Sequence, residues 1–403
     1  MHRRHFLQQT AASALALSTS GYWLNHPLSA APAEGIGVAG KSAELLPFTL
    51  VPLVAETPVS LLDKERITPK SDLFVRNNQD WKEGLTLEPY PRAGWTIELT
   101  GLIDKPVKIA ATDLEKLEQE SHEMVLQCSG SSRSLYSKAA KTEGTQWGRG
   151  GIGNVVFRGV PLAAVLEHLK VKVNPEARFV TANGIDEPPP KKDDFEHSLL
   201  VADVLAKSLF ALEMNGEPLP ALHGGPVRLV TPGFYGTMQV KWLKQLRFEK
   251  NETTVSHQVP KYRMPHAPIP PGTDYKFTVE NSRPNYQMRV KSVLLSPEAD
   301  ASLPASEFKV RGVAFNDGAA AMEAVLISTD RGRSWSQTKL EAPENPTGWT
   351  KFETAVKLEP GVHEIWSRAI DQLGRSQPLD GTIYWNPHGY EWNGVEKIKV
   401  KVA

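Results

Sequence analysis

Residues 126–134 read LQCSGSSRS, and Cys128 within them is the only cysteine in the 403-residue sequence. The apolar run Glu123–Gln127 precedes it and predicts a short strand that delivers the cysteine into a loop of small residues. Arg133 follows the cysteine by five positions. A single cysteine excludes an intrachain disulfide, so Cys128 is an inert buried thiol, an intermolecular link, a nucleophile or a metal ligand. The residues alone leave these four roles open.

The N-terminus, MHRRHFLQQTAASALALSTSGYWL, matches a twin-arginine export signal. The pair Arg3 and Arg4 precedes a weakly apolar stretch, residues 11–24, that is too short and too polar for a membrane span. Small residues follow near position 30 and suit cleavage. We therefore predict a signal peptide over residues 1–33 and a periplasmic location. Because this export route carries folded proteins that have usually acquired a cofactor, it also hints at a bound cofactor.

The composition indicates an ordinary globular protein. Lysine plus arginine and aspartate plus glutamate both number 46, so the formal net charge is zero, and nothing favours a nucleic-acid partner or an anionic membrane. The 31 prolines and 30 glycines favour loops, turns and β structure. The chain that follows the signal is long enough for two domains.

Strand and helix signals alternate through about residue 250. This alternation predicts an α+β fold, with a mixed α/β domain over residues 34–270. The expected elements are strands at residues 95–99, 179–182 and 226–230 and helices at residues 112–120 and 160–169.

From Asn281 onward the pattern changes to short strand-like runs that turn residues separate. Many short strands without a helical period predict a β-sandwich, here over residues 271–403, with the domain boundary in the proline-rich stretch 260–285. The runs lie at residues 287–295, 308–314, 323–328, 334–339, 351–357 and 363–370.

Several cations stand among glycines or apolar residues and not in charged surface runs. They are Arg76 in FVRNN, Arg133, Arg228 in the HGGPVR that begins at His223, and Lys241 in QVKW, which we predict to be a strand. Guanidinium groups match the oxygens of phosphate and sulfate, so this placement indicates an anion site. Each cation could instead pair with an acid or brace a loop, and the residues leave that alternative open.

Taken in order, these stretches resemble the sulfite oxidase family of molybdopterin enzymes. Cys128 with Arg133 is similar to the family's molybdenum-ligand loop. Further similar stretches are WGRGGIGNVVFRGVPL at 147–162, EMNGEPLP at 213–220 and STDRGRSW at 328–335. The last of these lies in a region that resembles the family's immunoglobulin-like dimerisation domain, so the resemblance also implies a homodimer.

The resemblance assigns roles to individual residues. It implies that Cys128 binds molybdenum beside the dithiolene sulfurs of molybdopterin, and a soft thiolate suits such a metal. It implies a substrate pocket built from Arg76, Arg133 and Tyr262. It further implies cofactor contacts from Phe74, Arg76, Asn77, Asn78, Asp186, His223, Arg228, Gln239 and Lys241.

The implied activity is oxidation of sulfite to sulfate by oxo transfer. The sequence has no haem-binding motif, so an external c-type cytochrome is the expected electron acceptor. The alternatives are a sulfur dehydrogenase subunit of thiosulfate oxidation, a sulfoxide reductase, or a non-catalytic binding protein. One departure from the family pattern is Asn78, where much of the family has histidine. Asparagine does not titrate near neutral pH, so the exact sulfur substrate stays open.

Overall fold

The strand that carries the cysteine loop runs longer than the sequence predicts. β6 spans Glu120–Gln127 and pairs antiparallel with β7 (Ile152–Pro161) along its whole length. Its last five residues are buried, so Cys128 follows directly from the core. The computed structural model describes residues 35–403, and the signal peptide predicted over residues 1–33 lies outside the described residues.

The sheet that contains β6 has the order β11-β10-β7-β6, and β12 also pairs with β10. All of these pairings are antiparallel. β12 begins at Arg228, so one sheet delivers both Cys128 and Arg228 to the same part of the molecule. The other bounds are Leu209–Met214 for β10, Glu217–Pro218 for β11 and Arg228–Val230 for β12.

A second five-stranded sheet has the order β5-β4-β13-β8-β9, in which only β4 and β13 run parallel. Its apolar side chains share the largest core with residues of two short helices, among them Val165 and Val204. The bounds are Thr96–Gly101 for β4, Val107–Ala110 for β5, Phe179–Asn183 for β8, Glu196–Leu200 for β9 and Gln245–Glu249 for β13, with the helices α4 at Leu162–His168 and α5 at Val201–Lys207.

A small antiparallel sheet brings the N-terminal part of the described chain to the same region. The order of its strands is β1-β2-β3, and β3 ends at Arg76. The strand bounds are Leu46–Leu50 for β1, Leu53–Glu56 for β2 and Val75–Arg76 for β3. A further pair joins β14 (Arg263–Pro265) to β15 (Ser282–Pro284), just past Tyr262.

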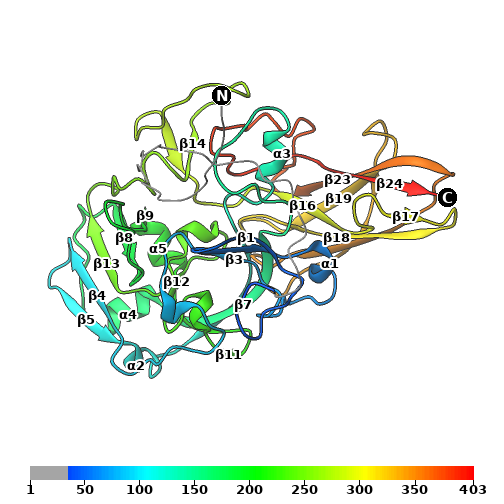
Figure 1. The fold of residues 1–403 in the computed structure, drawn as a ribbon. Coiled ribbons are helices and arrows are strands. Elements are labelled where there is room, and N and C mark those ends of the chain that lie inside the picture. The colour runs from blue at the N-terminus through cyan, green and yellow to red at the C-terminus, as the bar shows by residue number, and fades with distance from the viewer. Residues whose placement is uncertain (1–34) are drawn as a thin grey trace, which may run out of the picture. The chain divides into compact units, whose positions relative to one another are not determined.

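The C-terminal strands form two sheets, drawn from yellow to red in Figure 1. One has the order β16-β18-β22-β21 and the other β17-β24-β23-β19-β20. Apolar residues of both sheets, such as Val310 and Ile365, share one core. The bounds are Lys291–Ser296 (β16), Ser302–Leu303 (β17), Phe308–Phe315 (β18), Met322–Ser328 (β19), Ser336–Gln337 (β20), Lys339–Glu341 (β21), Thr350–Val356 (β22), Gly361–Asp371 (β23) and Glu396–Val402 (β24).

The described residues contain less helix than the sequence predicts, so this part of the protein is mostly β. No α-helix there exceeds seven residues, and none is long and apolar enough to cross a membrane. The remaining helices are α1 at Val59–Leu62, α2 at Ala111–Leu114 and α3 at Arg133–Ser137, with 3₁₀ turns η1 at Lys82–Gly84, η2 at Ala221–His223 and η3 at Gly236–Met238.

Three local predictions are wrong. The helix expected over residues 112–120 ends at Leu114, because the residues from Glu120 onward pair with β7. The helix expected from Val160 begins only at Leu162, because residues up to Pro161 extend β7. The QVKW segment is not a strand: its Trp242 has φ 52°, a left-handed conformation that interrupts extended structure.

The C-terminal strands pack against the strands that lead to Cys128. One core cluster joins Val125 of β6 and Ile152 of β7 to Val293 of β16 and Val313 of β18. Trp349, which is fully buried, belongs to the same cluster. The cysteine loop therefore begins where β6 and β7 contact the C-terminal strands β16 and β18.

Candidate active site

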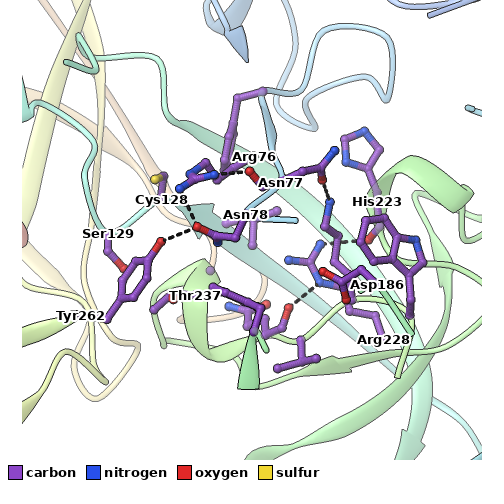
Figure 2. A pocket seen from close by; sticks show the side chains of 18 residues that line it. Arg76, Asn77, Asn78, Cys128, Ser129, Asp186, His223, Arg228, Thr237 and Tyr262 are labelled. Atoms are coloured by element: carbon purple, nitrogen blue, oxygen red, sulfur yellow. Dashed lines mark hydrogen bonds between the residues drawn. The ribbon is translucent and has the colours of Figure 1, made fainter. Parts of the chain in front are cut away.

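A cavity that opens to solvent lies at the end of β6, with about 710 Å³ of empty space when its open mouth is included. Figure 2 shows side chains from distant parts of the sequence turned toward it, with Cys128, Arg76 and Tyr262 at one end and His223, Asp186 and Arg228 toward the other. The lining residues are Phe74, Arg76, Asn77, Asn78, Leu126, Cys128, Ser129, Asp186, Phe195, His223, Arg228, Gly236, Thr237, Gln239, Val240, Lys241, Trp242 and Tyr262.

Every site residue that the sequence predicts lines this cavity except Arg133. The Arg133 side chain is buried and donates from Nε to the carbonyl oxygen of His388 and from Nη1 to that of Thr145, both at 2.7 Å. Its guanidinium carbon lies 5.1 Å from the centre of the Tyr390 ring. Because α3 begins at Arg133, the side chain turns toward the segment around His388 and away from the cavity wall. A direct substrate contact from Arg133 stays a prediction.

The Cys128 side chain is half-buried and opens onto the cavity. Its backbone N–H donates to the carbonyl of Gly151 at 2.9 Å, which fixes the loop against the glycine-rich segment before β7. Burial raises the pKa of the Cys128 thiol, and the nearby charges of Arg76 and Arg133 oppose that rise. A thiol held beside two cations is suited to act as a thiolate ligand.

Beside Cys128, one acceptor joins two of the predicted substrate residues. The Asn78 side-chain oxygen accepts a hydrogen bond from Nη2 of Arg76 at 2.6 Å and one from the hydroxyl of Tyr262 at 3.1 Å (Figure 2). Arg76 also donates to the backbone carbonyl of Asn77. Tyr262 has φ 53°, a left-handed conformation that is strained for a bulky residue. The surrounding packing therefore holds this tyrosine against its local backbone preference.

The other end of the cavity concentrates buried cations. Arg228 donates to the backbone carbonyls of Gln239 and His223, both at 3.0 Å, and Lys241 donates to the side chain of Asn77 and the carbonyl of Leu222. Burial lowers the pKa of Arg228 to about 9 and the pKa of Lys241 well below its usual range. Within residues 35–403, neither cation makes an ion pair with a carboxylate. Such a desolvated positive region favours a bound anion.

The one carboxyl group on the cavity wall is Asp186. Burial raises its pKa to about 7, and the charge of Lys241 opposes that rise. A carboxyl with this pKa exchanges its proton near neutral pH, so it can accept hydrogen bonds from N–H donors of a ligand or donate one itself.

Several polar atoms on the cavity wall are buried and have no hydrogen-bond partner. Buried polar groups are nearly always bonded, so these atoms indicate a polar ligand that completes them. They are Nδ2 of Asn77, Oγ of Ser129, Nε2 of His223 and Oε1 of Gln239.

Sequence reasoning missed a further pair, Thr237 on the cavity wall and the fully buried His197 behind it. The Gln258 amide donates to Glu252, so its oxygen faces Nδ1 of His197 at 2.9 Å and fixes the proton there. Nε2 of His197 then accepts from the Thr237 hydroxyl at 3.1 Å. Burial lowers the pKa of His197 to about 3, so it stays neutral, and the lone pairs of Thr237 can accept from a ligand.

No sequence signal marks Thr237, because its role depends on His197, Gln258 and Glu252, which are distant from it in sequence. Trp242 and Phe195 were missed for a different reason: single aromatic residues are ordinary core members, and only the cavity shows that they line it.

Comparisons with known proteins agree with this geometry. Residues 87–257 match the model of the oxidoreductase molybdopterin binding domain, and residues 282–403 match that of the Mo-co oxidoreductase dimerisation domain. The chain belongs to the sulfite oxidase family of molybdopterin enzymes. Its cofactor is Mo-molybdopterin.

Two curated relatives and one solved structure place the chain within the family. Mitochondrial sulfite oxidase of Drosophila melanogaster is 28% identical over 90% of this chain, which spans 64% of that protein's length. Sulfite oxidase of Arabidopsis thaliana is 28% identical, with 84% of this chain and 89% of the relative covered. The sulfane dehydrogenase SoxCD from Paracoccus pantotrophus is 25% identical, with a TM-score of 0.73 over 88% of this chain and 85% of that one.

The residues on the cavity wall fit the family's cofactor. Cys128 opens onto the cavity, and its thiolate would be a soft ligand for the metal. The unpaired cations Arg228 and Lys241 suit a phosphate, and the unbonded polar atoms of Asn77, His223 and Gln239 suit a polar ring system. The fit includes both ends of the cavity, so one elongated ligand can meet all of these groups.

Proposed function

We propose that the protein oxidises sulfite to sulfate and passes the electrons to an external c-type cytochrome. Sulfite and water become sulfate, two protons and two electrons, and the cytochrome accepts the electrons one at a time. The observation that carries this proposal is the meeting of Arg76 and Tyr262 at Asn78, beside Cys128. The similarity to proteins named sulfite oxidase supports the choice of substrate.

The chain's residues have distinct tasks in this reaction. The cofactor supplies oxygen-atom transfer coupled to two electrons. Arg76 binds oxygens of the anionic substrate through charge-assisted hydrogen bonds and turns its sulfur toward the Cys128 side of the cavity. The Tyr262 hydroxyl, which donates to Asn78, can redirect its proton to a substrate or product oxygen. Asn78 accepts from both residues and keeps this arrangement over a wide pH range, since an amide does not titrate.

A second candidate reaction is oxo transfer to a sulfur atom that another molecule carries. The observation that favours it is the similarity to the structure of a sulfane dehydrogenase, which covers most of both chains. A sulfoxide reductase and a non-catalytic binding protein are the remaining alternatives.

Elemental analysis and substrate assays test the proposal. We expect the purified protein to contain roughly one molybdenum per chain, as one thiolate ligand implies, and to reduce a c-type cytochrome when sulfite is added. A fully loaded protein that reduces the cytochrome with a carrier-bound sulfane but not with sulfite would favour the second candidate. A protein without molybdenum would favour a binding function.

We further propose that the C-terminal region is an immunoglobulin-like sandwich through which two chains form a homodimer. Its two sheets around a common core and its match to a dimerisation domain support this proposal. Light scattering of the purified protein tests it, and a monomer at micromolar concentration would contradict it.

We also propose that the protein is periplasmic and leaves the cytoplasm through the twin-arginine route. The motif Arg3-Arg4 at the N-terminus supports this location. Replacing both arginines by lysine should leave the cofactor-loaded protein in the cytoplasm, as fractionation would show. Arrival of the double variant in the periplasm would contradict the assignment.

A further inference from the structure

Four charged side chains, three buried and one half-buried, form a cluster where the C-terminal sheets meet the cysteine loop. They are Glu56 at the end of β2, Arg149 before β7, Lys291 at the start of β16 and Glu396 at the start of β24. Glu56, Lys291 and Glu396 are 5%, 1% and 2% exposed. None of the four lines the cavity, and the two positive and two negative charges balance. This buried cluster has no part in the function proposed above.

Lys291 reaches the cysteine loop directly. Its Nζ donates to the hydroxyl of Ser132 at 3.0 Å, and both residues are almost completely buried. Ser132 has φ 70°, a left-handed conformation that is unfavourable for a non-glycine residue. The bond from Lys291 therefore holds the loop in a turn that its own backbone disfavours.

Glu56 holds the neighbouring glycine-rich segment. Its carboxylate accepts from the backbone N–H groups of Gly148 at 2.8 Å and Gly150 at 2.5 Å. The same segment bonds to the cysteine loop through its carbonyl groups, since Ser132 donates to Gly148 at 2.6 Å and Cys128 donates to Gly151 at 2.9 Å. Glu56 thus positions the backbone on which the Cys128 loop rests.

Arg149 and Glu396 tie that segment to the C-terminal strands. Their side chains are 2.7 Å apart, Arg149 also donates to the carbonyl of Leu294, and Glu396 accepts from the N–H of Leu294. Strands β16 and β24 therefore reach the cysteine loop through two separate side-chain contacts, one from Lys291 and one through Arg149.

The cluster also acts through its charge. Burial lowers the pKa of Lys291 to about 8, and the charges of Glu396, Glu56 and the Cys128 thiolate oppose that fall. Lys291 stays protonated at neutral pH, so it is a positive charge on the protein side of the cysteine. In a water-poor interior, such charges are screened far less than on the surface.

We propose that Lys291 and Glu56 are positioning residues for Cys128. Lys291 holds the cysteine loop from β16, Glu56 holds it from β2 through the glycine-rich segment, and both set the electrostatic field at the metal ligand. A positive charge favours the electron-rich, reduced state of a nearby metal, and a negative charge favours the oxidised state. This inference rests on Cys128 as the molybdenum ligand, as proposed above.

The test is a redox titration of the molybdenum in two cofactor-loaded variants. One variant removes a positive charge and the other removes a negative charge. We expect Lys291→Met to shift the one-electron equilibrium toward the oxidised metal by about tenfold, or about 59 mV to lower potential. Glu56→Gln should shift it in the opposite direction. A purely structural role would not produce shifts of opposite sign.

Arg311→Met is the matched control. Arg311 of β18 pairs with Asp63 at the end of α1, so this variant also breaks a contact to a C-terminal sheet, but neither residue lines the cavity. We expect an unchanged potential. Equal potentials in Lys291→Met, Glu56→Gln and the parent protein, or shifts of the same sign, would overturn the proposal.

Ser132→Ala keeps the proposal testable if Lys291→Met does not load its cofactor. This variant removes the hydroxyl that accepts from Lys291 and keeps the buried charge. We expect faster loss of molybdenum during dialysis and a nearly unchanged potential, and a loss rate equal to the parent's would contradict the positioning role. If Cys128→Ser itself kept its metal, the ligand assignment would fail independently of these results.

Discussion

The cations of the cavity and those of the C-terminal region differ in what neutralises them. Arg76, Arg228 and Lys241 donate to amide and carbonyl oxygens. In the C-terminal region, Arg375 pairs with both Asp317 and Asp371. Arg283 and Arg289 likewise share the fully buried carboxylate of Glu391.

The pKa shifts follow the same division. Burial lowers the pKa of Arg228 to about 9, whereas the hydrogen bond and charge of Asp317 raise the pKa of Arg375. A cation without a carboxylate partner destabilises the empty cavity, and a bound anion removes that cost. A paired cation is already neutralised and stabilises the fold. The partner of each cation therefore distinguishes a binding role from a structural one.

The largest effect is expected when the thiolate is removed and the cations of the cavity are left unchanged. Cys128→Ser should lose its molybdenum and all activity, because a serine oxygen is a harder and weaker donor for this metal. The cations that suit the phosphate remain in place, so the variant should still retain pterin. Metal analysis and pterin fluorescence after denaturation measure the two contents. Normal turnover in the serine variant would end the ligand assignment.

Replacing one cation of the cavity and, separately, one cation of the C-terminal region by methionine tests the comparison directly. Arg228→Met should reduce cofactor content about a hundredfold or more, because two charge-assisted contacts of roughly 1.5–3 kcal/mol each are lost. Its cofactor-free form should be at least as stable as the parent, since a costly buried charge is gone.

Arg375→Met is the counterpart and should keep its cofactor. It should lose about 1–3 kcal/mol of unfolding free energy, because the buried carboxylate of Asp371 loses a hydrogen-bond partner, although water partly screens the half-exposed Arg375. Cofactor assays and urea denaturation give both quantities. Equal cofactor loss in the two variants would remove the distinction between paired and unpaired cations.

Arg76 tests whether the end of the cavity beside Cys128 binds an anion, as we expect of the end that holds Arg228 and Lys241. Arg76→Gln should raise KM for sulfite by roughly ten- to a hundredfold, since each 1.4 kcal/mol of lost binding is about a factor of ten. Rates are normalised to molybdenum. An unchanged KM with low cofactor content would instead assign Arg76 to the cofactor.

The smallest effect is expected for Tyr262→Phe. The change removes the hydrogen bond to Asn78 and keeps the ring, so KM should rise about two- to tenfold, in line with 0.5–1.5 kcal/mol for a neutral hydrogen bond. A loss as large as that of Arg76→Gln would show that the hydroxyl does more than align the pair. Steady-state kinetics over a range of pH measure it.

Local sequence patterns determined much of the β structure. The runs at residues 308–314 and 323–328 became β18 and β19, because short apolar runs between turns suit strands that are buried along most of their length. The last strand, EKIKVKV at Glu396–Val402, was missed although its alternation is regular and its burial follows it. The helices were overestimated, since strand pairing over residues 120–127 and 152–161 overrides local helix signals.

For the site, the sequence by itself determined the cysteine loop and the residues of the recognisable motifs, because each motif keeps its chemistry within a few neighbouring positions. Tertiary structure decided the rest. It turned Arg133 toward His388, placed His197 behind Thr237, and brought Lys291 to Ser132. These contacts join residues 40 to 255 positions apart, so no local spacing encodes them. The fold selects them because a buried polar or charged group that has no partner within about 3 Å destabilises the structure.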